Sequence, residues 1–227
     1  KSSDLAFLKL PGQDDYNAEL ILDKYNLQKD NYITMIPSGL VRCYTDNRKK
    51  YIENLIRIIE YIITVRRIKI VLMPHVLRPE TSDDRIIIRE IIKQIGKVYL
   101  EKLIIIDDIM LPLDARVILG NGIFSITGRM HGAISTFQMN KPAISLSYSV
   151  KYQGVIGEGL ACHDLIVEAS DYKKWENGEV ALETINKIEY LFNDYTTFVT
   201  RIRSKAAFCK DEVFQMIDQV HSELEGL

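Results

Sequence analysis

The segment SITGRMHGAISTF, residues 125–137, places an arginine and a histidine where a strand is expected to pass into a helix. Arg129 offers a planar guanidinium that can bind two oxygens at once. His131 can give or take a proton near neutral pH. Lys151 adds another cation just after the next predicted strand. Three basic groups at strand and helix ends suit a small, highly charged anion.

The backbone at this junction is expected to strengthen the same site. If Thr127 caps the helix, the first-turn N–H groups are free and carry the positive end of the helix dipole. Gly128 has no side chain, so a ligand can approach the backbone closely. Residues two apart do not share a helix face. Arg129 and His131 therefore converge only if the helix begins at about this point.

Two further strand ends carry basic or imidazole side chains. The predicted strand ITMIP ends at Pro37-Ser38-Gly39 and is followed by Arg42, and IKIVLM ends at Pro74-His75. Ligands of open parallel sheets bind at the carboxyl ends of the strands. Arg42 and His75 are therefore candidate ligands of the same anion.

Each candidate also has a purely structural interpretation. His131 and His75 are of types that often serve as turn or helix-start hydrogen-bonding groups, and Lys151 is equally consistent with a solvated loop lysine. Asp83 and Asp84 resemble a metal-binding pair, but a helix cap followed by a first-turn acid explains them better. No cluster has metal-ligand spacing, and there is no Walker loop or GxGxxG motif. We expect neither a metal nor a cofactor.

The order of predicted elements indicates an α/β fold. Short runs rich in Ile and Val alternate with helical patterns, which is typical of a parallel sheet built from βαβ units. The expected strands are 31–37, 68–73, 103–107, 122–127, 142–148 and 163–169, and the expected helices are 47–67, 82–102, 113–119 and one starting near residue 128. We predict a Rossmann-like parallel sheet with helices on both faces and a helical C-terminal tail.

The chain divides into three predicted parts. Residues 1–30 form a leading segment that opens as though in mid-protein, residues 31–170 form the Rossmann-like domain, and residues 171–227 form helices packed on it. One apolar stripe of the tail comprises Leu191, Tyr195, Phe198 and Ile202, and a second comprises Phe214, Ile217, Val220 and Leu224.

Composition excludes several functional classes. A net charge of −2 over 227 residues gives no reason to expect a nucleic-acid partner. Cys43, Cys162 and Cys209 form no CxxC pair, so we expect reduced, mostly buried thiols in a cytoplasmic protein. No apolar run approaches the roughly 18 residues of a transmembrane segment, and no signal peptide is evident.

Two stretches resemble the polysaccharide pyruvyl transferase family. GIFSITGRMHGAISTFQMNKPAISLSYSVKYQGVIGEGL, residues 122–160, is similar to the family's R-x-H-(G/A) element and its Pro-initiated strand that ends in Tyr, two residues and Lys. VLMPHVLRPETSDD, residues 71–84, is similar to the family's Pro-His or Pro-Gln strand end followed by an Asp-Asp helix start. The resemblance covers about residues 32–165. Gly128 departs from it, since serine is common there, so this sequence lacks the hydroxyl for one possible contact.

The resemblance implies both a fold and a reaction. Members are expected to share the GT-B arrangement of two Rossmann-like halves, and this chain looks like the donor-binding C-terminal half, with the N-terminal half absent. They transfer pyruvate from phosphoenolpyruvate to a sugar of a cell-surface polysaccharide or its precursor, forming a ketal. Arg129, Lys151 and the helix start would then bind phosphoenolpyruvate, with Arg42, His75 and Gly128 as further contacts. His131 would act as general acid or base.

Two other functions stay open on the sequence. A nucleotide-sugar glycosyltransferase of GT-B type would use the same architecture, although its diphosphate usually requires a loop richer in glycine than MIPSGLVR. A non-catalytic binding domain is the other alternative.

Overall fold

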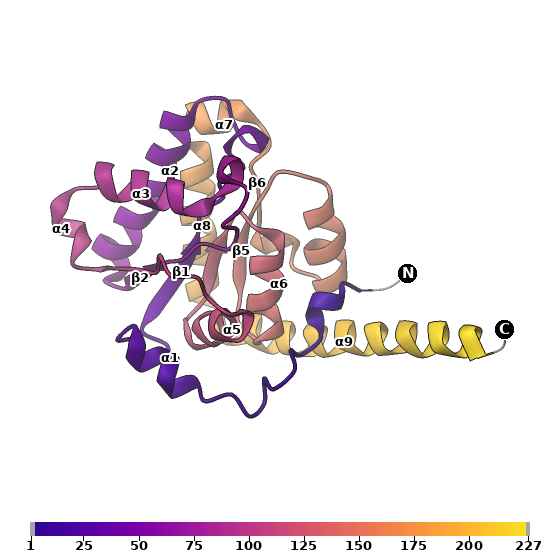
Figure 1. Cartoon of the computed structure of the whole chain (residues 1–227). Helices are drawn as coiled ribbons and strands as arrows, with labels where there is room; N and C mark the ends of the chain where they lie inside the picture. Colours follow the sequence, from indigo (N-terminus) through magenta and orange to yellow (C-terminus); the bar gives the residue numbers. More distant parts are fainter. Residues whose placement is uncertain (1–2, 226–227) are drawn as a thin grey trace.

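A sheet of six parallel strands forms the centre of the protein (Figure 1). The computed structural model describes residues 3–225, and the strands lie in the order β3-β2-β1-β4-β5-β6. Every neighbouring pair is parallel. The strands are Tyr32–Ile36 (β1), Lys69–Leu72 (β2), Leu103–Ile105 (β3), Ser125–Thr127 (β4), Ala143–Ser147 (β5) and Ile166–Glu168 (β6). The predicted fold class is confirmed.

Helices connect the strands and extend beyond the sheet. They are Ala18–Lys24 (α1), Arg48–Tyr61 (α2), Asp84–Gln94 (α3), Lys97–Leu100 (α4), Pro112–Asn121 (α5), Met130–Gln138 (α6), Tyr172–Glu176 (α7), Glu179–Asn193 (α8) and Tyr195–Glu225 (α9). The 3₁₀ turns are Leu5–Phe7, Val41–Cys43, Glu80–Ser82 and His163–Leu165, and the π-helical segments are Ile62–Arg66 and Gln153–Gly159.

The sheet is buried on both faces, as its nearly continuous apolar strands predict. Along β1, Ile33 and Met35 belong to the larger apolar core, whereas Tyr32 and Ile36 belong to a smaller one that includes residues of α5. A methyl group added at Gly132 of α6 would lie 2.9 Å from Ile36, so α6 packs on that second face. The alternation of β1 side chains between the two cores follows from the two-residue period of a strand.

The predicted helix 82–102 is two helices instead of one. α3 ends at Gln94, because the backbone of Ile95 and Gly96 is extended, and α4 begins at Lys97. Glycine is a poor helix former, and Ile95 is buried in the core. Burial of that side chain and the low helix propensity of its neighbour together favour the break.

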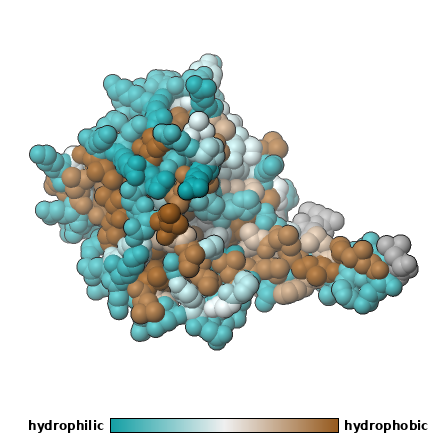
Figure 2. Space-filling view, viewed as in Figure 1, coloured by the Kyte–Doolittle hydropathy of each residue, from teal (hydrophilic) through white to brown (hydrophobic). Residues whose placement is uncertain are grey.

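The C-terminal helices bury only part of their apolar surface. Leu191, Phe198 and Ile202 of the first predicted stripe are buried across the break between α8 and α9. Phe214 and Leu224 of the second stripe are 46% and 66% exposed. Figure 2 shows this hydrophobic strip along the projecting arm of α9. Within residues 3–225, none of the helices combines the length and the apolar character of a membrane-spanning segment.

The thiols differ in their surroundings. Cys162 and Cys209 are buried, Cys43 is exposed, and all three are free.

Candidate functional site

The candidate site lies where the sheet topology reverses. From β1 the chain proceeds towards β2 and β3, and from β4 it proceeds towards β5 and β6, so β1 and β4 flank the switch point at which open α/β sheets bind ligands. The carboxyl ends of these two strands are joined, since the Gly128 N–H donates to the Ile36 carbonyl at 3.1 Å. The segments after β1, β2, β4 and β5 therefore share one edge.

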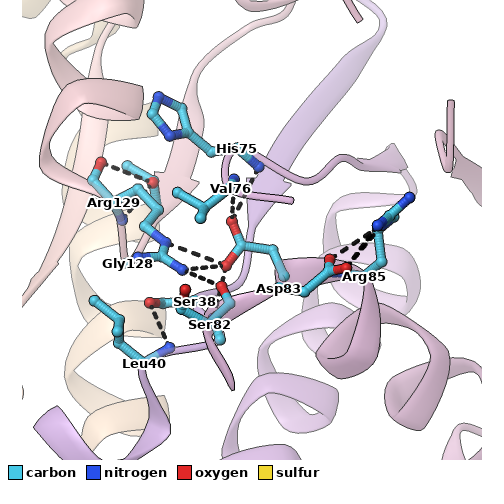
Figure 3. Close-up of polar contacts among 12 residues, drawn as sticks. Ser38, Leu40, His75, Val76, Ser82, Asp83, Arg85, Gly128 and Arg129 are labelled. Atoms are coloured by element: carbon cyan, nitrogen blue, oxygen red, sulfur yellow. Dashed lines mark hydrogen bonds and ion pairs between the residues drawn. The ribbon is translucent and has the colours of Figure 1, made fainter. Parts of the chain in front are cut away.

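Arg129 is buried at this edge and forms an ion pair with Asp84 (Figure 3). Its Nε and Nη2 donate to Asp84 Oδ1 at 3.1 and 2.6 Å, and Nη2 also donates to the Ser82 carbonyl at 2.7 Å. Nη1 has no hydrogen-bond partner within residues 3–225. Most of the guanidinium N–H donors that the sequence assigns to a ligand therefore bind acceptors within the protein.

The Asp84 carboxylate occupies a position that is surrounded by hydrogen-bond donors of the protein. Besides Arg129, it accepts the backbone N–H groups of Gly39 at 2.7 Å, His75 at 3.0 Å and Val76 at 2.9 Å. These donors come from the segments after β1 and β2, so one carboxylate connects two strand ends with the start of α3. Sequence reasoning missed this role.

The neighbouring acid behaves as predicted. Asp83 is the N-cap of α3 and accepts the Arg85 N–H at 2.9 Å. The Arg85 side chain holds the pKa of the Asp83 carboxyl below its usual range, chiefly through hydrogen bonds. Gly39 allows the loops to close on this helix start, because a Cβ there would lie 2.5 Å from the Ser82 carbonyl carbon.

Gly128 is enclosed by the protein itself. Its carbonyl accepts the hydroxyls of Tyr44 at 2.6 Å and Tyr152 at 3.0 Å. Burial raises the pKa of both phenols, so each keeps its proton and donates. A Cβ at Gly128 would lie 2.8 Å from the Tyr44 hydroxyl and 2.9 Å from Ser38 Cβ. The missing side chain therefore makes room for these two residues.

The helix start differs from the expected cap. Arg129, not Thr127, occupies the N-cap position of α6, and its side chain makes no capping bond. Thr127 Oγ1 accepts the Arg129 N–H at 2.9 Å and so orders the turn before the helix. The N–H groups of residues 130–132 have no acceptor within the described chain. The positive end of the α6 dipole is consequently available to an anion.

His131 lies in the first turn of α6 with 58% of its side chain exposed. Its Nε2 is 3.5 Å from Asp4 Oδ2. The ring does not contact the Arg129–Asp84 pair through any hydrogen bond within residues 3–225. Arg129 and His131 therefore start from the same junction, but the Arg129 side chain is bonded to Asp84, whereas the His131 ring lies beside Asp4.

Lys151 follows β5 on the same edge of the sheet. β4 and β5 are parallel neighbours, and Tyr152, the next residue, reaches the Gly128 carbonyl. The Lys151 side chain is exposed and has no hydrogen bond or ion pair within residues 3–225. It is therefore a cation that the fold places at this edge without using it.

His75 and Arg42 are the two remaining residues that the sequence predicts as ligands of the anion. The His75 ring lies close to α6, since a Cβ at Gly132 would be 3.6 Å from His75 Cδ2. Although His75 as a whole residue is exposed, desolvation of its imidazole lowers the pKa of this group below its usual value, against the opposing effect of Asp84. Arg42 is exposed in the 3₁₀ turn after β1.

A pocket of about 270 Å³ adjoins His75. Its walls are mainly apolar and include Met73, Leu77 and Leu119. The lining comes from segments that are distant in the sequence, so no local pattern signals this pocket. Within residues 3–225, no group of three or more His, Cys, Asp or Glu side chains is arranged to hold a metal ion.

Residues 2–150 match the family model described as polysaccharide pyruvyl transferase. No curated protein sequence matches the chain significantly.

Solved structures of similar fold are about twice as long as this chain. The UDP-GlcNAc 2-epimerase of Methanocaldococcus jannaschii, in complex with UDP-GlcNAc and UDP, superposes with a TM-score of 0.56 at 16% identity, covering 83% of this chain and 45% of that one. The Neisseria meningitidis UDP-GlcNAc 2-epimerase bound to UDP-GlcNAc gives 0.57 at 10% identity, with 90% and 48% covered.

A third similar structure is the UDP-forming α,α-trehalose-phosphate synthase of Burkholderia xenovorans in complex with glucose-6-phosphate. It gives a TM-score of 0.53 at 9% identity, with 95% of this chain and 48% of that one covered. At such identities the similarity establishes the fold, which matches half of a GT-B-type enzyme.

Proposed function

Because the chain belongs to the polysaccharide pyruvyl transferase family, we propose that it binds phosphoenolpyruvate and serves transfer of the pyruvyl group to a sugar. The acceptor is a sugar of a polysaccharide or its precursor, and the product is a pyruvate ketal. The chain spans less than half of the similar two-halved structures, so we propose that further parts of the enzyme contribute to the acceptor site.

One observation carries this proposal: the free N-terminus of α6 lies at the strand edge that Lys151 also reaches. Phosphoenolpyruvate has a carboxylate and a phosphate, so it requires several cationic or N–H donors. The N–H groups of residues 130–132, the Lys151 ammonium and the remaining Nη1 of Arg129 can supply them. Arg42, in the 3₁₀ turn after β1, is a further candidate contact.

His131 is the proposed proton donor. A proton added to the methylene carbon of phosphoenolpyruvate leaves positive charge on the carbon that bears the phosphate. A sugar hydroxyl oxygen bonds to this carbon and loses its proton, and the phosphate leaves with its bridging oxygen. A second sugar hydroxyl then closes the ketal and loses its proton. General acid–base catalysis of this kind typically contributes ~10²–10⁴ in rate.

His75 suits a neutral role at the same edge. With its pKa lowered by burial, the ring is mostly uncharged near pH 7. We propose that it offers a hydrogen bond to the donor or to water, and that positive charge comes from Lys151 and the start of α6. The adjoining apolar pocket is less suited to the charged groups of the donor.

Calorimetric titration of the chain with phosphoenolpyruvate and with UDP-GlcNAc tests the proposal. Phosphoenolpyruvate should bind, and Lys151→Ala should weaken it by about 1.5–3 kcal/mol, the range for hydrogen bonds to charged groups. Lys29→Ala is the matched control, because Lys29 is also exposed but precedes β1 and so lies at the opposite edge. Tight binding of UDP-GlcNAc without phosphoenolpyruvate binding would favour a nucleotide-sugar glycosyltransferase instead.

A further inference from the structure

The segment before α1 is fixed to the domain by a buried arginine. Arg116 of α5 is 5% exposed and donates to the carbonyls of Ala6 at 2.9 Å and Leu8 at 2.8 Å. It also donates to Gln13 Oε1 at 2.7 Å. Phe7 is buried in the larger core. These anchors give the residues beside them a defined place next to α6.

Asp4 stands at the beginning of this anchored segment. Its Oδ1 accepts the Ala6 N–H at 2.9 Å and caps the 3₁₀ turn Leu5–Phe7. Its other oxygen, Oδ2, lies 3.5 Å from His131 Nε2. One carboxylate oxygen is therefore held by the backbone while the second faces the imidazole.

Two other histidines form ion-pair contacts of the same length but lack this support. His163 lies 3.5 Å from Glu158, and His221 lies 3.5 Å from Glu225. The side chains of these glutamates are 66% and 71% exposed, whereas that of Asp4 is 23% exposed. A carboxylate that is fixed by a backbone hydrogen bond and partly buried can hold its partner in one place at a smaller entropic cost than a mobile surface side chain.

We propose that Asp4 is the positioning residue of His131 in pyruvyl transfer, an inference that depends on the proposed function. Asp4 fixes the orientation of the ring at the start of α6 and balances its positive charge whenever both ring nitrogens are protonated. The nitrogen that Asp4 does not face, Nδ1, is then the atom that exchanges the proton with the substrate. Asp4 does not itself touch the donor.

The test uses the full-length enzyme with its natural acceptor and the substitution Asp4→Asn. Asparagine keeps a capping oxygen for the turn but removes the charge. The kcat should fall about tenfold or more, part of the ~10²–10⁴ that an acid or base contributes, while donor affinity stays within about twofold. Asp4→Glu should recover part of the kcat. Asp15→Asn is the control, since Asp15 is an exposed acid near the same segment.

Unchanged kcat in Asp4→Asn would overturn the proposal. So would tighter donor binding, because Asp4 would then be occupying the anion site. Ring-nitrogen NMR of this chain without donor separates the pairing from the reaction: Asp4→Asn should shift the His131 signals and leave those of His163 and His221 in place. If the His131 signals do not move, the pairing is wrong. If they move but the wild-type enzyme transfers no pyruvate, the proposed function is wrong.

Discussion

The two sides of the β4 carboxyl end use their charges differently. Towards β1 and β2, Arg129 is buried against Asp84, whose carboxylate also accepts three backbone N–H groups. Elsewhere at this edge, the Lys151 ammonium after β5 and the backbone N–H groups of residues 130–132 have no hydrogen-bond partner within residues 3–225. We call these the closed side and the open side. The comparison shows that a basic residue at a strand end can be structural, and that the donors left unused identify the place for a ligand.

The closed side is expected to matter for folding. A buried ion pair contributes little net stability compared with apolar side chains, but removal of one partner leaves a charge buried without compensation. Here the cost includes three backbone donors that lose their acceptor. The open side carries no comparable penalty, because its side chains are exposed.

The largest expected effect is therefore that of Asp84→Ala on stability. The free energy of unfolding should fall by about 3–5 kcal/mol, as for other broken buried pairs. Urea denaturation measures it. Asp107→Ala removes an acid from the exposed pair with Arg89 and should cost less than about 1 kcal/mol. Equal midpoints for the two variants would show that the closed side does not hold the fold together.

The next effect concerns chemistry on the open side. His131→Gln in the full-length enzyme should lower kcat by about 10²-fold or more and leave donor affinity largely intact, because Lys151 and the α6 N–H groups remain. Stability should change by less than about 0.5 kcal/mol, since the side chain is mostly exposed. Steady-state kinetics with the natural acceptor decides this, with His221→Gln as control. Near-normal turnover would leave His131 as a binding or structural residue.

The smallest effect tests how the two sides are joined. Tyr152→Phe removes one of the two hydroxyls that donate to the Gly128 carbonyl, and Tyr44 still satisfies that carbonyl. A loss of about 0.5–1.5 kcal/mol in unfolding free energy is expected. Tyr44→Phe should cost more, because the Tyr44 hydroxyl also lies 3.2 Å from the Leu146 carbonyl. The reverse order in denaturant melts would contradict this assignment of the bonds.

Much of the fold could be predicted because its signals are local. The Ile- and Val-rich runs locate the strands, and Asp83 is recognisable as a cap from its place before an apolar helix. The apolar stripe of α9 could also be recognised, but its period does not reveal whether another surface covers it. The break at Gly96 had a local signal in glycine that the longer helical pattern concealed.

The site was harder to predict because its partners are far apart. Asp84 meets Gly39 and Arg129, each 45 residues away in the sequence. The spacing around Arg129 is compatible with binding either a ligand or a buried carboxylate, and only the fold distinguishes them. The segment with Asp4 shows no local pattern that links it to His131. The sequence located the edge of the sheet, and tertiary structure decides which of its charges are free.

Amide NMR of the chain during titration with phosphoenolpyruvate tests the division into two sides most directly. The donor is predicted to shift the signals of residues 130–132 and of Lys151 strongly. The signals of Gly39 and Val76, whose N–H groups Asp84 accepts, should move little. Strong shifts at Gly39 and Val76 with none at residues 130–132 would mean that the ligand displaces Asp84, which would contradict the account.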